Sequence, residues 1–131
     1  MTKKYLGVDY GTVRIGLAIA DAESKTAVVY GTVDSVAAVA DVVKKEDISA
    51  VVVGEPFSVS DRDHELPDDF LRFKQHLKTT LTDVELIFED ERLSSKYADS
   101  LIGGKKTKAG RDEIAAIAIL QGYLDSLSLK N

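Results

Sequence analysis

The spacing of apolar residues divides the chain into segments with two different periods. Short runs rich in apolar and β-branched residues are typical of strands, whereas apolar residues that recur every three or four positions are typical of helices. By this criterion, strands are expected at residues 3–9, 14–21, 26–33, 50–54 and 84–88. Helices are expected at 35–46, at 67–81 and at 112–127, with Ser35 as the cap of the first.

The order of these elements, β-β-β-α-β-α-β-α, predicts an α/β fold. Two hairpins are followed by crossovers, which are right-handed in nearly all proteins, so we expect a mixed five-stranded sheet with helices packed on it. The second strand places Gly16, Ala18 and Ala20 on one face, and these small residues indicate that another element lies close to it. In α/β sheets, functional sites gather beyond the carboxyl ends of the strands.

Composition narrows the class of protein. The 131 residues suffice for one domain with a proper core, and we expect a single domain over residues 1–131. No apolar run approaches the roughly 18 residues that span a membrane, the first residues lack a signal-peptide pattern, and there is no cysteine for disulfides or thiolate metal sites. The expected location is the cytoplasm. Because the net charge is −5, any contact with nucleic-acid phosphates has to be local.

Acidic residues stand at the ends of three predicted strands, at Asp9, Glu55 and Asp90-Glu91, and Asp112 opens the last helix. A carboxylate beside a core is costly unless it binds something positive. Oxygen ligands without cysteine favour a hard cation such as Mg²⁺ or Mn²⁺. Two such ions about 4 Å apart can activate water and stabilise the leaving oxygen in phosphodiester cleavage. These segments therefore predict one pocket that holds divalent cations.

Each carboxylate also has an ordinary structural explanation. Asp112 is a suitable N-cap for the last helix, and Asp9 could form a side-chain turn with the residues that follow it. The pair Asp90-Glu91 could be solvated, and Glu55 could face solvent. The predicted topology favours the metal site, because it brings all these segments to one end of the sheet.

A short basic segment precedes Asp112. Residues 103–111 carry four positive charges and no negative one, so they are expected to hold the phosphates of a nucleic-acid strand. The predicted nucleic-acid-binding residues are Lys105, Lys106, Lys108, Arg111 and Arg14. His64 and His76 are given no role, and His76 is expected at the surface of its helix.

Four blocks, in order and at suitable spacing, are together more specific than any one alone. They are residues 7–18, GVDYGTVRIGLA; residues 51–56, VVVGEP; residues 90–95, DERLSS; and residues 111–124, RDEIAAIAILQGYL. With these blocks the chain resembles the YqgF/RuvX family, whose members are described as pre-16S rRNA nucleases and Holliday junction resolvase-like proteins. The resemblance covers about residues 5–124.

The resemblance implies an RNase H-like fold and metal-dependent hydrolysis of phosphodiester bonds, linked most often to maturing the 5′ end of 16S rRNA. By block, Asp9, Asp90-Glu91 and Asp112 fall on the family's acidic positions. We take Asp9, Glu91 and Asp112 as catalytic residues and metal ligands. Glu91 is preferred to Asp90, which could instead bond to the backbone of the following turn.

One departure from the family pattern concerns the fourth strand. The family usually has Gly-Leu-Pro where this chain has Gly54-Glu55-Pro56. Many RNase H-like nucleases carry a catalytic carboxylate at about that place, so Glu55 is predicted to be an additional metal ligand. The alternative is a tolerated substitution that faces solvent.

Several functions fit these observations. The first is an endonuclease acting on structured RNA, with pre-16S rRNA favoured, and a close variant is a resolvase of branched DNA, which should be a stable dimer. Both need Mg²⁺ or Mn²⁺, and the sequence leaves monomer and homodimer open. A nucleotide-binding protein of the actin and sugar-kinase type would need a second lobe. A non-catalytic RNA-binding module would not require the acidic residues.

Overall fold

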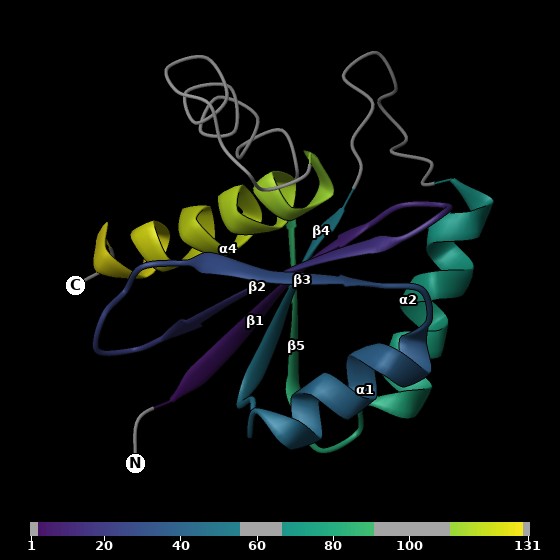
Figure 1. The fold of residues 1–131 in the computed structure, drawn as a ribbon, viewed down its shortest axis with the longest axis horizontal. Helices are drawn as coiled ribbons and strands as arrows, with labels where there is room; N and C mark the ends of the chain where they lie inside the picture. Colours follow the sequence, from purple (N-terminus) through teal and green to yellow (C-terminus); the bar gives the residue numbers. More distant parts are fainter. Residues whose placement is uncertain (1–2, 56–66, 91–110, 130–131) are drawn as a thin grey trace.

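The computed structural model describes residues 3–55, 67–90 and 111–129, except for the side chains of residues 90, 111, 112, 128 and 129. Its elements follow the predicted order (Figure 1). The strands are β1 (Lys4–Tyr10), β2 (Ile15–Asp21), β3 (Val28–Val33), β4 (Ala50–Glu55) and β5 (Glu85–Asp90). The helices are α1 (Val36–Lys45), α2 (Asp68–Thr80) and α4 (Arg111–Leu129).

The strands form one five-stranded sheet in the order β3-β2-β1-β4-β5. Strand β2 pairs antiparallel with β1 and β3, whereas β4 pairs parallel with β1 and β5. This is the mixed sheet predicted from the sequence. Because β1, β4 and β5 run in the same direction, their carboxyl ends lie at the same edge of the sheet.

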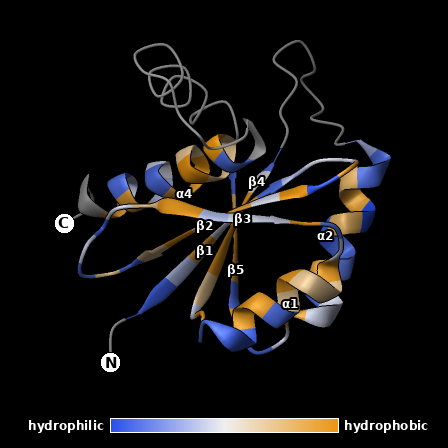
Figure 2. Ribbon diagram, in the orientation of Figure 1, coloured by the Kyte–Doolittle hydropathy of each residue, from blue (hydrophilic) through white to orange (hydrophobic). Residues whose placement is uncertain are grey.

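Helices cover both faces of the sheet. Helices α1 and α2 lie on one face and α4 lies on the other (Figure 1). In Figure 2, apolar residues run along the strands, while the helices carry apolar and polar patches in turn. Since α4 packs on β2, where Ala18 and Ala20 are buried, it is the element that the small residues of this strand predicted.

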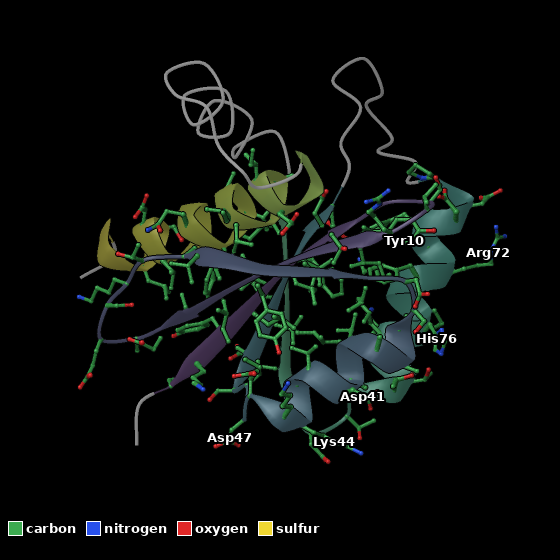
Figure 3. All side chains as sticks on the ribbon, in the orientation of Figure 1. Tyr10, Asp41, Lys44, Asp47, Arg72 and His76 are labelled. Carbon is green, nitrogen blue, oxygen red and sulfur yellow. The ribbon has the colours of Figure 1, made fainter. Side chains whose placement is uncertain are left out.

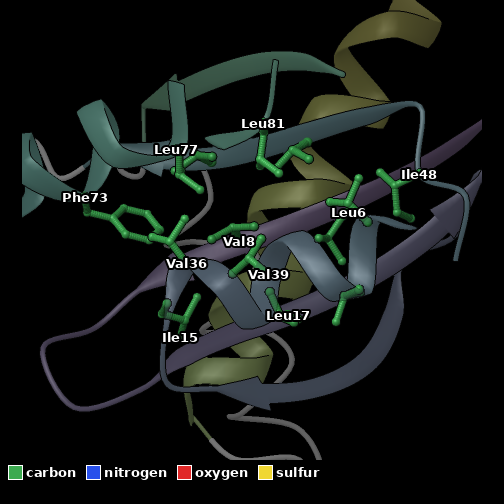
Figure 4. Close-up of a cluster of buried hydrophobic side chains, with 14 of the residues drawn as sticks. Leu6, Val8, Ile15, Leu17, Val36, Val39, Ile48, Phe73, Leu77 and Leu81 are labelled. Carbon is green, nitrogen blue, oxygen red and sulfur yellow. The ribbon is translucent and has the colours of Figure 1, made fainter. Parts of the chain in front are cut away.

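The core therefore has two parts. Under α1 and α2, the larger cluster joins Leu6, Val8 and Leu17 of the sheet to Val39 and Leu77 of the helices (Figure 4). Under α4, the second cluster is built from smaller sheet residues and from the apolar face of that helix. Its buried members are Tyr5, Ala18, Ala20, Ala27, Ala50, Val52, Ala116, Ile119, Leu120 and Leu124. Small side chains on the sheet let α4 approach closely.

The structure corrects several predicted boundaries. Strand β1 extends to Tyr10, because this residue still pairs with Ile15 across the first hairpin. Strand β3 begins at Val28, two residues later than predicted, since the N–H of Ala27 donates to the side chain of Gln121 instead of to the sheet. Strand β4 extends one residue to Glu55, and β5 spans Glu85–Asp90 instead of residues 84–88.

The predicted cap of α1 and the predicted buried face of α2 are confirmed. The hydroxyl of Ser35 accepts a hydrogen bond of 3.1 Å from the N–H of Ala38 and caps α1 as predicted. The predicted stripe of α2, with Phe70 and Phe73 among its members, is buried. His76 is exposed as expected. None of the helices in the described ranges is long and apolar enough to cross a membrane.

Candidate metal and nucleic-acid site

The site predicted from the sequence falls at the edge where β1, β4 and β5 end. The parallel pairing sets Val8 beside Val53 in β1 and β4, and sets Glu55 beside Asp90 in β4 and β5. Asp9 follows Val8 directly. The structure thus brings the backbones of Asp9, Glu55 and Asp90 to one edge of the sheet, as the topology predicted.

Asp9 faces the side of the sheet that α4 covers. Side chains alternate between the two faces of a strand, and Leu6 and Val8 belong to the core under α1 and α2, whereas Tyr5 belongs to the core under α4. Asp9 follows Tyr5 by four positions, an even number, so the two side chains point to the same face of the sheet. Only 9% of the surface of Asp9 is exposed. A nearly buried carboxylate requires favourable partners to remain charged.

Helix α4 runs back along β1 towards this carboxylate. The ring of Tyr123 lies 6.1 Å from that of Tyr5 near the start of β1. Further along, Gly7 lies under Ala116 and Leu120, so closely that an added Cβ would come within 2.8 Å of the Ala116 carbonyl oxygen. The helix therefore crosses β1 with its beginning towards the carboxyl end of the strand, and in Figure 1 its first turn lies beside the end of β4.

This direction brings the start of α4 towards the level of Asp9. Asp112 precedes Ala116 by four residues, which is about 6 Å along a helix axis. Asp9 follows Gly7 by two residues, which is about 6.6 Å along a strand. The backbones of Asp9 and Asp112 thus both lie towards the carboxyl end of β1 from the point where Gly7 meets Ala116. The side chain of Asp112 is outside the described part of the structure, so its role as a ligand stays a prediction.

Glu55 faces the opposite side of the sheet. It has the same parity as Val51 and Val53, which belong to the core under α1 and α2. Its carboxylate accepts a hydrogen bond of 2.6 Å from the Nζ of Lys74 on α2. That ammonium also lies 4.5 Å from the centre of the Phe88 ring. This geometry favours the pairing with Lys74 over binding of a metal together with Asp9, because the two side chains point to opposite faces of the sheet. That Glu55 is a metal ligand stays a prediction.

Several predicted site residues are not described. Glu91, Lys105, Lys106 and Lys108 lie outside the described residues, and Arg111 is described only as the first residue of α4. No three acidic residues or histidines gather into a metal site among the residues that are described. Since the predicted ligand set includes Glu91 and the Asp112 side chain, that observation leaves the set untested.

Arg14 lies at the surface, directly before β2. It lines a cavity of ≈ 310 Å³ beside the turn that joins β1 to β2. This places it on the side of the turn where α1 and α2 lie, in a cavity that Arg72 and His76 of α2 also line. Its predicted role in binding nucleic acid stays a prediction.

Sequence reasoning missed the part played by Tyr10. Its ring stacks on Phe73 with the centroids 4.4 Å apart, and it meets Phe70 edge-on at 6.1 Å. Burial raises the pKa of its phenol, and so does Asp69, whose carboxylate accepts the phenol's hydrogen bond. Tyr10 thus ties the residue after Asp9 to the first turn of α2. The aromatic stripe of α2 was a signal for this contact, because it needed a partner on the sheet.

Glu89 was also missed. It is paired with Gly54 in the parallel register and has the same parity as Ile87, which packs in the core under α4. Its carboxylate therefore lies on the same face as Asp9, two strands away. Burial raises the pKa of Tyr123 most. Glu85 and Tyr5 raise it further, and the negative charge of Glu89 makes the last contribution. The alternation of apolar residues in β5 was the available signal.

Comparison of the sequence with known proteins shows which family the chain belongs to. A model of the family described as RuvX, Holliday junction resolvase, matches residues 3–126. Two relatives whose names give pre-16S rRNA nuclease as their proposed activity come from Staphylococcus carnosus and Staphylococcus haemolyticus. They are 33% and 34% identical over 97% of this chain and 99% of their own.

The solved structures agree on the fold. RuvC of Thermus thermophilus superposes with a TM-score of 0.70 at 15% identity, over 97% of this chain and 96% of that one. The same protein in complex with a Holliday junction substrate gives a TM-score of 0.67 over 96% of both chains. This likeness confirms the predicted RNase H-like architecture. Since the family model covers nearly the whole sequence, the chain belongs to the RuvX family.

Proposed function

We propose that the chain is a nuclease that hydrolyses phosphodiester bonds with Mg²⁺ or Mn²⁺, and that Asp9, Glu91 and Asp112 hold the metal. The observation that carries this proposal is the nearly buried Asp9 on the face of the sheet that α4 covers, with the first turn of α4 directed to the same edge. Carboxylate oxygens are the donors that these hard cations prefer, so the residues fit the metal.

The metal would supply an activated water and would stabilise the leaving oxygen. The chain's own residues position these components. Strand β1 is paired on both sides, with β2 and β4, and this fixes the backbone of Asp9. Gly7 lets α4 approach the strand, and we propose that Asp112, in the first turn of this helix, binds metal at the same edge as Asp9. We propose that Lys105, Lys106, Lys108 and Arg111 hold the phosphates of the substrate.

For the substrate we propose precursor 16S rRNA, with cleavage in the maturation of its 5′ end. The names of relatives that are 33% and 34% identical over nearly their whole length support this choice. The chain's overall charge of −5 opposes non-specific attraction to RNA. A small number of local cationic contacts would therefore set where the RNA binds.

The test is cleavage of an RNA that carries the 5′ precursor segment of 16S rRNA, with Mn²⁺ as the metal. We expect cleavage by the wild type, and a loss of more than about 100-fold in the Asp9→Asn variant, which keeps the size of the side chain but removes its charge. Glu55→Gln is the matched control, since it removes a carboxylate from the other face of the sheet. Cleavage that persists in EDTA, or in Asp9→Asn, would overturn the proposal.

A second candidate is resolution of four-way DNA junctions. The description of the matching family model favours it, and it would use the same carboxylates. A resolvase cuts two strands symmetrically, so the protein should then be a stable dimer. Incubation of a synthetic four-way junction with the protein and Mn²⁺, together with its mass in solution, separates the candidates. Paired symmetric cuts by a dimer favour resolution, whereas an intact junction beside a cleaved RNA favours rRNA processing.

A further inference from the structure

The cavity that Arg14 lines lies beside the β1–β2 turn, on the side that faces α1 and α2. Its volume is ≈ 310 Å³, within the range of small-molecule sites. Three segments form its walls: the turn itself, the beginning of α1 and one side of α2. The charged and aromatic lining residues used below are Tyr10, Arg14, Asp34, Asp69, Arg72 and His76.

Cationic and aromatic groups are combined in this cavity. Arg14 comes from the start of β2, while Arg72 and His76 lie one turn apart on α2 (Figure 3). Arginine is suited to phosphate because its planar fork donates two parallel hydrogen bonds. Tyr10, stacked on Phe73, adds an aromatic surface to the wall. Arginine beside aromatic rings is the combination that proteins use to hold single-stranded nucleic acid.

Two carboxylates also line the cavity. Asp69 accepts the hydrogen bond of the Tyr10 phenol, so its carboxylate is directed to the Tyr10 side of the cavity. Asp34 directly precedes the cap of α1, whose positive end points towards the same cavity. A phosphate is therefore expected on the side of Arg72 and His76 and not in the centre of the cavity.

This cavity adjoins another one that reaches the end of β4. A neighbouring cavity of ≈ 280 Å³ reaches Gly54 at the end of β4. The two cavities have four lining residues in common: Tyr10, Gly11, Thr12 and Asp69. Asp9 lines neither cavity but immediately precedes Tyr10, so a chain of nucleotides bound at the candidate metal site could pass over the turn into these hollows.

We propose that the single-stranded RNA flanking the scissile phosphate crosses the β1–β2 turn, and that Arg72, with Arg14 and His76, binds a flanking phosphate in this cavity. The inference rests on the proposed nuclease function and adds a binding subsite to it. The subsite lies on the side of the β1–β2 turn that faces α1 and α2, whereas Asp9 faces α4. Contacts at the metal site and at this subsite would then hold the strand across the edge at Asp9.

The test measures the affinity of a fluorescein-labelled single-stranded RNA of about 12 nucleotides, by anisotropy, in the Asp9→Asn background so that no cleavage interferes. The test variant is Arg72→Ala with His76→Ala, and both residues are exposed on α2, so the fold is expected to be kept. Lys78→Ala is the matched control, because it removes one positive charge from the same helix outside the cavity. Arg72→Lys keeps the charge without the fork.

We expect the double variant to bind about five- to tenfold more weakly than the background protein. The slope of log affinity against log salt should fall by about 0.7 for each phosphate that the protein no longer neutralises. Lys78→Ala should keep both values, and Arg72→Lys should keep the slope while the affinity decreases. An unchanged affinity in the double variant, or an equal decrease in Lys78→Ala, would overturn the subsite.

The two proposals fail in different ways. If the wild type does not cleave RNA with Mn²⁺ while the double variant still shows the weaker affinity and the smaller slope, the nuclease proposal falls and the cavity remains an RNA-binding site. If the wild type cleaves RNA but the double variant binds RNA as tightly as the Asp9→Asn background protein, the nuclease proposal stands and the subsite is rejected.

Discussion

Replacing Gly7 with alanine tests how closely α4 has to approach β1 for the site to form. A Cβ at this position would lie 2.7 Å from the Cβ of Leu120 and 2.8 Å from the carbonyl oxygen of Ala116. Neither atom belongs to the far end of a flexible side chain. The helix as a whole therefore has to move.

The size of the movement follows from ordinary packing distances. Two carbon atoms in contact are about 3.5–4.0 Å apart, so α4 has to retreat by roughly 1 Å. Such overpacking costs about 1–3 kcal/mol, which lowers the melting temperature by roughly 3–10 °C in a chain of this length. A displacement of 1 Å in a catalytic group can cost about 100-fold in rate. Because Asp112 is carried on the displaced helix, we expect a loss of this order.

The assay compares Gly7→Ala with Gly122→Ala, a substitution on α4 itself that has nothing within 4 Å of the added Cβ. Melting temperatures and RNA cleavage with Mn²⁺ are measured, the latter well below the melting temperature of either variant. Gly122→Ala should cleave like wild type and gain about 0.5–1 kcal/mol, because alanine favours a helix. Wild-type cleavage by Gly7→Ala would refute the reasoning that the approach of α4 builds the site.

Three further substitutions test individual contacts. Gln121→Leu should lower the free energy of unfolding by about 2–4 kcal/mol in urea titrations, because the buried amide bonds to the backbone of Ala27 and Lys25; a loss below about 1 kcal/mol would contradict this role. Glu55→Gln should cost about 1 kcal/mol through its pair with Lys74 and leave Mn²⁺ affinity unchanged in calorimetry, whereas a weakened affinity would restore Glu55 as a ligand. Tyr10→Phe removes a phenol whose pKa is raised in the folded protein, first by burial and then by Asp69. The hydroxyl's contribution to the free energy of unfolding is therefore complete below the unfolded pKa of about 10, and it is lost as pH rises through the folded pKa. The stability gap to wild type should therefore shrink from pH of about 8 to about 11, and a constant gap would contradict the contact.

The sequence was sufficient for the sheet and for the edge at which the backbones of Asp9, Glu55 and Asp90 lie. The change from period two to period three or four separated strands from helices, and chain order then required β1, β4 and β5 to run parallel. Strand ends were less predictable, because pairing with distant strands sets them. Tyr10 was expected in a turn but pairs with Ile15, and Ala27 was expected in a strand but bonds to Gln121.

The face that each carboxylate occupies was harder to predict. The run Val51-Val52-Val53 is apolar on both sides, as parallel central strands usually are, so it gave no sign of which side Glu55 would take. Its partner Lys74 lies on a helix whose stripe predicted the buried side but not the pairing of its polar residues. The close approach of α4 was easier to predict, because Gly16, Ala18 and Ala20 of the second strand already indicated that another element lies close to one face of the sheet.

The central claim is that Asp9 and Asp112 hold the same metal, and Mn²⁺ binding measured by calorimetry tests it most directly. Asp9→Asn and Asp112→Asn should each weaken binding more than about tenfold, and the double variant should bind little more weakly than either single one, because the two losses concern one site. If either single variant binds Mn²⁺ as tightly as the wild type, the two carboxylates do not share a metal and the account is wrong.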